Sequence, residues 1–463
     1  MSVISQTDLS QELLQKYSVS IPRYTSYPTA PEWTEHFSIK DYLNVNKIAN
    51  EMKTPISLYF HLPFCESQCY FCACNIVISK KKSVTNPYLE HIKKEIKTTG
   101  NLIDKNRKVE QIHMGGGTPT YFSPDELEDF YKTIKENFNV ASGCEIGIEV
   151  DPRVTSYNHL QTLSKLGFNR LSMGIQDFDY KVQESINRIQ PFEDTNRLFK
   201  IARDFDFNSI NVDLIYGLPF QTKDGFAKTI DLIINLSPDR IALFHYAHLP
   251  QMIKHQFKYI PQNHLPSSDS KIEIFQYAVK ALTKSGYSFI GLDHFAKPDD
   301  ELAQARLNKT LHRNFQGYTT KAGCDLYGFG ITAISNIQNT FSQNIKKLNL
   351  YYEKLNLSEL PILKGIVLNN DDLIRKDIIM RILCHGFLIK SEIEKLYQIK
   401  FDDYFYSENE VLKKLQTDGL VKTSKNEVEI TSTGQFFLRN IACTFDFYLQ
   451  NKNGKQKIYS KSV

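Results

Sequence analysis

The chain has 463 residues, 41% of them hydrophobic and 12% aromatic, which is enough for two or three domains with a large buried core. Its formal net charge of +4 is small for this length, so the composition does not call for a polyanionic partner such as a nucleic acid. Eight cysteines are too few for a disulfide framework, and no apolar run reaches the ~18 residues that a membrane-spanning helix needs.

The N-terminal region carries no targeting signal that we recognise. Its first residues contain no basic stretch followed by an apolar core, so we expect no signal peptide. This predicts a cytoplasmic protein without membrane association, in a compartment that keeps cysteines reduced. Residues 1–50 precede the first predicted strand, and we treat them as an N-terminal extension that contributes to the cover of the active site.

Residues 51–355 show strands alternating with helices. Ser123 and Glu126 form the capping box of one predicted helix, and Tyr88–Thr99 is another. The predicted strands are Ile56–Leu62, Val109–Met114, Cys144–Val150, Arg170–Ile175, Ile210–Tyr216, Arg240–Tyr246 and Tyr287–Leu292. Such alternation requires right-handed crossovers and a parallel sheet. We therefore predict an α/β fold with a full or partial TIM-like (β/α) barrel.

Residues 356–463 have a different pattern, which predicts a mainly helical domain. The expected helices are Asp371–Cys384, Ser391–Tyr397 and Val411–Gln416, and the expected strands are Leu420–Thr423 and Glu427–Thr431. Helices followed by a β-ribbon resemble a winged-helix module, which often binds DNA. The segment in the position of a recognition helix has only two lysines, which favours a cap packed on the barrel. A barrel that is already capped is expected to be a monomer.

Four cysteines, Cys65, Cys69, Cys72 and Cys74, lie within ten residues after the first predicted strand. The first three have the spacing Cys-x3-Cys-x2-Cys. Three thiolates this close can bind three irons of one [4Fe–4S] cluster and leave the fourth iron open to a small molecule. Structural zinc is the alternative, but zinc sites usually draw on two separated pairs of ligands. The other four cysteines are scattered, which is typical of small buried thiols.

Polar or glycine-rich residues follow six successive predicted strands. The active site of a (β/α) barrel lies at these C-terminal strand ends. After the cysteine loop, the next strand ends carry Gly115-Gly116-Gly117-Thr118, Glu149 with Asp151, Gln176, Asp213, and His245 with Ala247. Three successive glycines allow backbone groups to approach a ligand closely, and no P-loop lysine follows them. The six strand ends together predict one active site.

Five stretches carry a specific resemblance to a known family. They are Pro22–Thr29, Tyr59–Asn75, Gly115–Thr120, Arg170–Phe178 and His312–Thr320. With the cysteine spacing, they resemble the oxygen-independent coproporphyrinogen III oxidases (dehydrogenases), a radical S-adenosylmethionine (SAM) family of haem biosynthesis. The resemblance covers nearly the whole chain and implies a radical SAM barrel. The haem-chaperone branch of this family is the alternative, but it tends to lack the fourth cysteine and the extended N-terminal segment, which this chain has.

The resemblance also implies roles for individual residues. Cys65, Cys69 and Cys72 would bind the cluster, whereas Cys74 would be needed for activity without being a ligand. The expected catalytic residues are Cys74, Tyr59 and Glu149. The family is described as holding two SAM molecules. The residues at its SAM-contacting positions are Tyr59, Phe71, Gly116, Gly117, Thr118, Glu149, Gln176, Arg188, Asp213, Ala247 and Ile334.

The implied reaction converts two propionate side chains of coproporphyrinogen III to vinyl groups, giving protoporphyrinogen IX and two CO2. Removing hydrogen from an unactivated propionate carbon is beyond ordinary side-chain bases, so a radical made from SAM at the cluster must perform it. A reducing donor such as a flavodoxin or ferredoxin system would supply the electrons. Arg23 and Arg313 are candidate cations for the substrate carboxylates, and the alternative is that their segments only seal the barrel.

Overall fold

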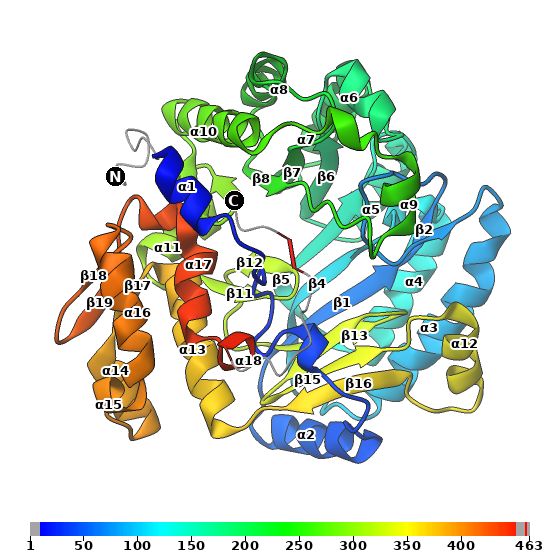
Figure 1. The fold of residues 1–463 in the computed structure, drawn as a ribbon. Helices are drawn as coiled ribbons and strands as arrows, with labels where there is room; N and C mark the ends of the chain where they lie inside the picture. The colour runs from blue at the N-terminus through cyan, green and yellow to red at the C-terminus, as the bar shows by residue number, and fades with distance from the viewer. Residues whose placement is uncertain (1–9, 451–458, 461–463) are drawn as a thin grey trace.

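A 12-stranded sheet forms the centre of the computed structural model, which describes residues 10–450 and 459–460 (Figure 1). Seven neighbouring strands are parallel: β13 (Asp325–Phe329), β1 (Ile56–Leu62), β4 (Lys108–Gly116), β5 (Asn139–Val150), β6 (Arg170–Gln176), β7 (Ser209–Tyr216) and β8 (Arg240–His245). Antiparallel strands flank them: β14 (Ile334–Ile337), β15 (Thr340–Asn344) and β16 (Ile362–Val367) on one side, and β10 (His294–Ala296) with β9 (Ser288–Gly291) on the other. The α/β prediction is confirmed, and the barrel is a partial, open one.

The predicted strands are present, but two edges of the sheet differ from expectation. The segment Tyr287–Leu292 was expected to continue the series, yet β9 joins the sheet through β10, which runs antiparallel to β8. Strand β13 extends the parallel series on the other side by pairing with β1. Strands β10 and β13 are short and do not follow a helix directly, which explains why the sequence did not predict them.

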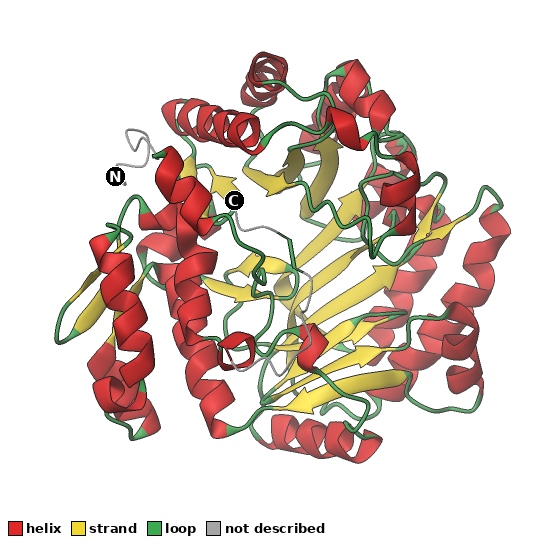
Figure 2. Ribbon diagram, in the orientation of Figure 1, coloured by secondary structure: helices red, strands yellow, loops and turns green. Residues whose placement is uncertain are grey.

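Helices cover the outer face of the parallel strands (Figure 2). They are α3 (Thr85–Gly100), α4 (Pro124–Asn137), α5 (Tyr157–Lys165), α7 (Phe192–Asp204), α8 (Lys223–Leu236) and α10 (Ser268–Lys284). The predicted capping box of α4 is confirmed, because the Ser123 hydroxyl accepts from the Glu126 amide and the Glu126 carboxylate accepts from the Ser123 amide. No helix among the described residues is long and apolar enough to cross a membrane.

The C-terminal region is mainly helical, as predicted. It contains α13 (Asn370–His385), α14 (Lys390–Tyr397), α16 (Tyr406–Thr417) and α17 (Leu438–Ala442), beside a small sheet of β17 (Phe387–Ile389), β19 (Glu427–Ile430) and β18 (Val421–Thr423). Helix α16 begins five residues before the predicted segment Val411–Gln416, and its Lys413 is paired with Glu410 at 2.7 Å. The winged-helix-like order of elements is therefore present without a basic helix face.

The N-terminal extension joins the C-terminal region to the barrel. It begins with α1 (Gln11–Tyr17) and ends with α2 (Ile39–Glu51). Between them, Tyr24 donates a hydrogen bond to Asp446 at 2.9 Å, while Arg23 pairs with Asp293 at the β9–β10 turn at 3.1 Å. The domain limits at residues 50 and 355 stay a prediction, but β16 still belongs to the sheet, so a division drawn on the sheet falls after Val367.

One buried ion pair ties β13 to the parallel strands. Arg107 and Asp325 are 2.6 Å apart, and their side chains are 0% and 4% exposed. Arg107 also donates to the Thr54 carbonyl and to the Tyr327 hydroxyl, at 2.7 and 2.9 Å. Removing one partner of such a pair leaves the other charge buried without compensation.

We therefore predict that Asp325→Ala lowers the free energy of unfolding by about 3–5 kcal/mol, measured by denaturant titration under anaerobic conditions. The matched control is Glu359→Ala, which breaks the exposed pair with Lys354 and is expected to cost less than about 1 kcal/mol. A loss of the same small size in both variants would show that the buried pair does not support the sheet.

Candidate active site

The cysteine loop is held at the C-terminal end of the parallel strands. After β1, the short strand β2 (Phe64–Cys65) pairs with β3 (Val77–Ile78) and closes the loop between them. The Thr118 amide donates to the Phe64 carbonyl at 2.9 Å, which fixes the loop against the glycine turn after β4. Cys65, Cys69 and Cys72 line one cavity of about 160 Å³, and none of them forms a disulfide.

The guanidinium groups of two arginines lie beside one of these thiols. Arg153 and Arg188 each donate to the Cys69 sulfur at 3.6 Å, and both pair with Asp151. Burial alone would raise the pKa of Asp151, but the two guanidinium groups outweigh it and lower that pKa to about 2. The two guanidinium groups thus place positive charge beside this sulfur, which suits a site that holds an anionic group.

The three glycines are needed for packing of the protein on itself. A Cβ on Gly115 would meet the Glu149 carboxylate at 2.7 Å, and one on Gly117 would meet the Pro63 carbonyl carbon at 2.6 Å. Gly116 has φ +110°, and a Cβ there would overlap the His61 ring. Gly116 and Gly117 do line the cavity, as expected. Their lack of side chains, however, lets β4 approach neighbouring protein groups rather than only a ligand.

Glu149 at the end of β5 lies between two cavities and lines both. It accepts a hydrogen bond from the Gly116 amide at 3.0 Å and lies 3.6 Å from the ring nitrogen of His113. Burial would raise the pKa of Glu149, but His113 and the Gly116 amide outweigh it and hold the pKa below its ordinary value. The side chain is thus an ionised acceptor at neutral pH.

The second cavity has a volume of about 600 Å³. Tyr59 from β1 lines it, stacked on His113 with ring centres 6.1 Å apart, and Ile334 from β14 lines it as well. Phe315 and Gln316 reach it from the turn between β11 (His312–Asn314) and β12 (Gly317–Thr319). The cavity is large enough for a sizeable organic ligand beside the cysteine loop.

Most of the residues expected to form the site come together. The smaller cavity is lined by Cys65, Cys69, Phe71, Cys72, Cys74, Gly116, Gly117, Thr118, Glu149, Gln176, Arg188 and Asp213. The larger one shares Cys74, Gly116 and Glu149 and adds Tyr59 and Ile334. Ala247 lines neither cavity, and its carbonyl accepts a hydrogen bond from Gln256 at 3.2 Å. Two adjacent cavities that share three lining residues therefore replace the single site that the strand ends predicted.

The sequence reasoning missed two groups at this site. Arg153 lies two residues after Asp151, in the loop that follows β5. Its position at a strand end is a signal that could have identified it. His113 lies within β4, where nothing but the tertiary structure brings it to Glu149. Asp213 was expected, and burial raises its pKa to about 6 although Asn211 and Ser172 donate hydrogen bonds to it.

The four cysteines do not converge as the ligands of one metal ion would. Within the described residues, no three His, Cys, Asp or Glu side chains are grouped to hold a single ion. Ligands of an iron–sulfur cluster bind separate irons, so they need to line one cavity without sharing a centre. The arrangement of Cys65, Cys69 and Cys72 meets this condition.

Comparison with known proteins identifies the family. Residues 59–233 match the model of the radical SAM superfamily. Oxygen-independent coproporphyrinogen III oxidases from Synechocystis and Escherichia coli are 44% and 43% identical to the chain, each over 98% of both sequences. The solved structure of coproporphyrinogen III oxidase from Escherichia coli, described as a radical SAM enzyme, superposes with a TM-score of 0.91 at 42% identity, covering 96% of this chain and all of that one.

The chain belongs to the oxygen-independent coproporphyrinogen III oxidases. As a radical SAM protein it uses a [4Fe–4S] cluster and SAM, which removes zinc as an interpretation of the cysteine loop. The names of these relatives also favour the oxidases over the haem-chaperone branch. The resemblance seen in the sequence is thereby confirmed over the full length.

The glycine packing generates a prediction for Gly117→Ala. Its Cβ would lie 2.6–2.9 Å from backbone atoms of Pro63 and Leu62, so the chain leading to Cys65 must shift. Overpacking of this kind costs about 1–3 kcal/mol, and we expect a lower melting temperature with reduced iron content after anaerobic reconstitution. Gly143→Asn is the control, because a Cβ there meets nothing within 4 Å and Asn tolerates positive φ. Wild-type iron content in Gly117→Ala would contradict the prediction.

Proposed function

We propose that this protein catalyses the oxygen-independent oxidative decarboxylation of two propionate side chains of coproporphyrinogen III, giving protoporphyrinogen IX. The observation that supports this most directly is the pair of adjacent cavities. One is lined by three thiols of a cluster-binding motif, and the other has room for a large ligand. Both lie in a chain that is more than 40% identical, over its whole length, to proteins named for this activity.

The residues present fit the cluster. We assign Cys65, Cys69 and Cys72 as its ligands, since their thiols line one cavity and Cys69 faces two guanidinium groups. Cys65 also lies 3.4 Å from the Thr118 hydroxyl, which can hold the sulfur in place. When bound, the cluster supplies the electron that cleaves SAM, and SAM supplies a carbon radical strong enough to remove hydrogen from a propionate.

The proposed SAM positions divide between the two cavities, which supports two SAM molecules. Arg188 is suited to the SAM carboxylate, because its Nε is buried without a hydrogen-bond partner among the described residues. Glu149 and Asp213 are carboxylates suited to ribose hydroxyl groups. Tyr59 and Ile334 would contact the second molecule in the larger cavity. Ala247 would contact SAM through its methyl group or its amide, because its carbonyl already accepts a hydrogen bond from Gln256.

Cys74 would act on the substrate side of the site. It lines both cavities, so its thiol can reach a ligand in the larger one without serving the cluster. Tyr59 and Glu149 flank the same space, and we assign them catalytic roles in orienting the reacting groups. The remaining parts of the proposal are a reducing donor of flavodoxin or ferredoxin type, a monomeric state and a cytoplasmic location.

The deciding experiment is anaerobic reconstitution with iron and sulfide, followed by product analysis with SAM, a reductant and coproporphyrinogen III. We expect a brown protein that releases CO2 and forms protoporphyrinogen IX. If the protein cleaves SAM but does not consume coproporphyrinogen III, it would carry out the same radical chemistry on a different substrate. A colourless protein that takes up no iron would overturn the proposal entirely.

The cysteine assignment predicts a difference between variants. Cys65→Ala, Cys69→Ala and Cys72→Ala are expected to lose most of the iron after reconstitution, because each removes one of three ligands. Cys74→Ala should keep its iron and its SAM cleavage while decarboxylation falls by at least a hundredfold, measured by product analysis. Cys144→Ser, at a buried thiol away from the cavities, is the control and should keep both properties. Iron loss in Cys74→Ala would contradict the division of roles.

The raised pKa of Asp213 predicts how SAM affinity depends on pH. Burial moves this pKa up to about 6, so the carboxyl group is protonated below pH 6 and ionised above it. An ionised carboxylate accepts a hydroxyl hydrogen bond more strongly, so SAM affinity should rise roughly three- to tenfold between pH 5 and pH 7.5. Calorimetric titration of reconstituted protein measures this. Asp213→Asn should remove the rise, and an unchanged pH profile in that variant would rule out the role.

A further inference from the structure

Arg313 in β11 is a buried cation with unpaired nitrogens. Its residue is 7% exposed, and its Nε and Nη1 have no hydrogen-bond partner among the described residues. The other candidate cation, Arg23, is in a different state. It pairs with Asp293 at 3.1 Å and donates to the His245 carbonyl at 3.2 Å. The structure therefore separates two arginines that the sequence presented as equivalent.

A buried charge without a hydrogen-bonded partner is costly, so each one calls for a physical explanation. A guanidinium group offers only donors, and carboxylates and phosphates are the partners that match its geometry. No acidic side chain is hydrogen-bonded to Arg313 in the described part of the chain. An anionic group of a ligand would supply the partner that the protein lacks.

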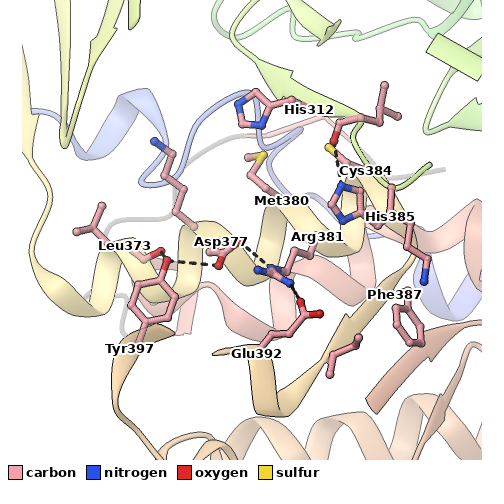
Figure 3. A pocket seen from close by; sticks show the side chains of 14 residues that line it. His312, Leu373, Asp377, Met380, Arg381, Cys384, His385, Phe387, Glu392 and Tyr397 are labelled. Atoms are coloured by element: carbon pink, nitrogen blue, oxygen red, sulfur yellow. Dashed lines mark hydrogen bonds and ion pairs between the residues drawn. The ribbon is translucent and has the colours of Figure 1, made fainter. Parts of the chain in front are cut away.

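Arg313 lies in the strand that leads to the larger active-site cavity, although it does not itself line that cavity. His312 before it lines a separate cavity of about 560 Å³ against α13, together with Cys384 and His385 (Figure 3). Phe315 and Gln316, at the turn after Asn314, line the larger active-site cavity. The amide nitrogen of Gln316 is also buried without a partner.

A row of rings extends from Arg313 to Arg23. The Arg313 guanidinium lies 5.0 Å from the Tyr318 ring, and the His294 ring packs edge-on against Tyr318 at 5.2 Å. Phe244 then packs against His294 at 5.8 Å, and Arg23 lies 5.5 Å from Phe244. Burial lowers the pKa of His294 to about 4, so the ring is uncharged at neutral pH. A row of uncharged rings between two arginines suits a ligand that has a large ring system and carries carboxylates.

We propose that Arg313 binds one propionate carboxylate of the tetracarboxylic porphyrinogen substrate, and that Arg23 instead holds the N-terminal extension over the site through Asp293. This inference rests on the proposed function and names the residue that recognises its substrate. Arg313 is a substrate-binding residue, and it acts through the N–H groups that the protein itself leaves unpaired. The neutral rings beside it would contact the macrocycle.

The test uses reconstituted wild-type protein, Arg313→Met and Arg313→Lys, with coproporphyrin III as a stable fluorescent probe. Arg313→Met should bind the probe at least tenfold more weakly, because a charged hydrogen bond is lost, and Arg313→Lys should keep part of the affinity. Iron content after reconstitution should not change. The ligand-free Arg313→Met protein should also melt at a higher temperature than the wild type, since an uncompensated charge has been removed.

A structural role for Arg313 would give the opposite result, with a lower melting temperature in Arg313→Met. That outcome, or wild-type affinity for the probe in this variant, would overturn the inference. The tetramethyl ester of the probe has no carboxylates and should bind both proteins equally. Arg23→Met is the matched control and should lower the melting temperature, because it breaks the pair with Asp293. If the wild type turns over the substrate but Arg313→Met binds the probe as tightly as the wild type does, only this inference fails. If the wild type neither binds the probe nor turns over the substrate, the proposed function fails as well.

Discussion

The hydrogen-bonded alignment of β1 with β4 is the constraint on which the rest of the site depends. It places the end of β1, where the cysteine loop begins, beside the glycine turn that ends β4. The Gly117 amide donates to the Leu62 carbonyl at 3.0 Å, so the two strand ends are fixed to each other by backbone groups. Glu149 on the next strand then reaches the Gly116 amide. The cysteine loop and the glycine turn are thereby positioned by backbone hydrogen bonds, and the Glu149 side chain is placed by the Gly116 amide.

Much of this arrangement could be predicted because it follows the periodicity of the chain. Strand β1 and the capping box of α4 have the bounds that their residue patterns indicate. The rule that active-site residues follow the strand ends places Glu149, Gln176 and Asp213 at one edge of the sheet, and in the structure all three line the smaller cavity. These features share a property: each is specified by residues close together in sequence.

The features that escaped prediction depend on contacts between distant segments. Strand β13 is short and buried, and its place beside β1 depends on Asp325 meeting Arg107. The division of the site into two cavities results from Cys74 and Glu149 standing between them, which no spacing in the sequence indicates. The difference between Arg23 and Arg313 likewise appears only when their surroundings are known.

The N-terminal extension has a consequence for the order of assembly in the cell. Its residues 21–27 leave the ribosome early, yet they are held by groups near the other end of the chain. Tyr24 is bonded to Asp446, and the carbonyl of Pro22 accepts from Arg439 at 3.1 Å. The extension can reach its final place only after translation is nearly complete, so the parallel sheet is synthesised before these contacts can form.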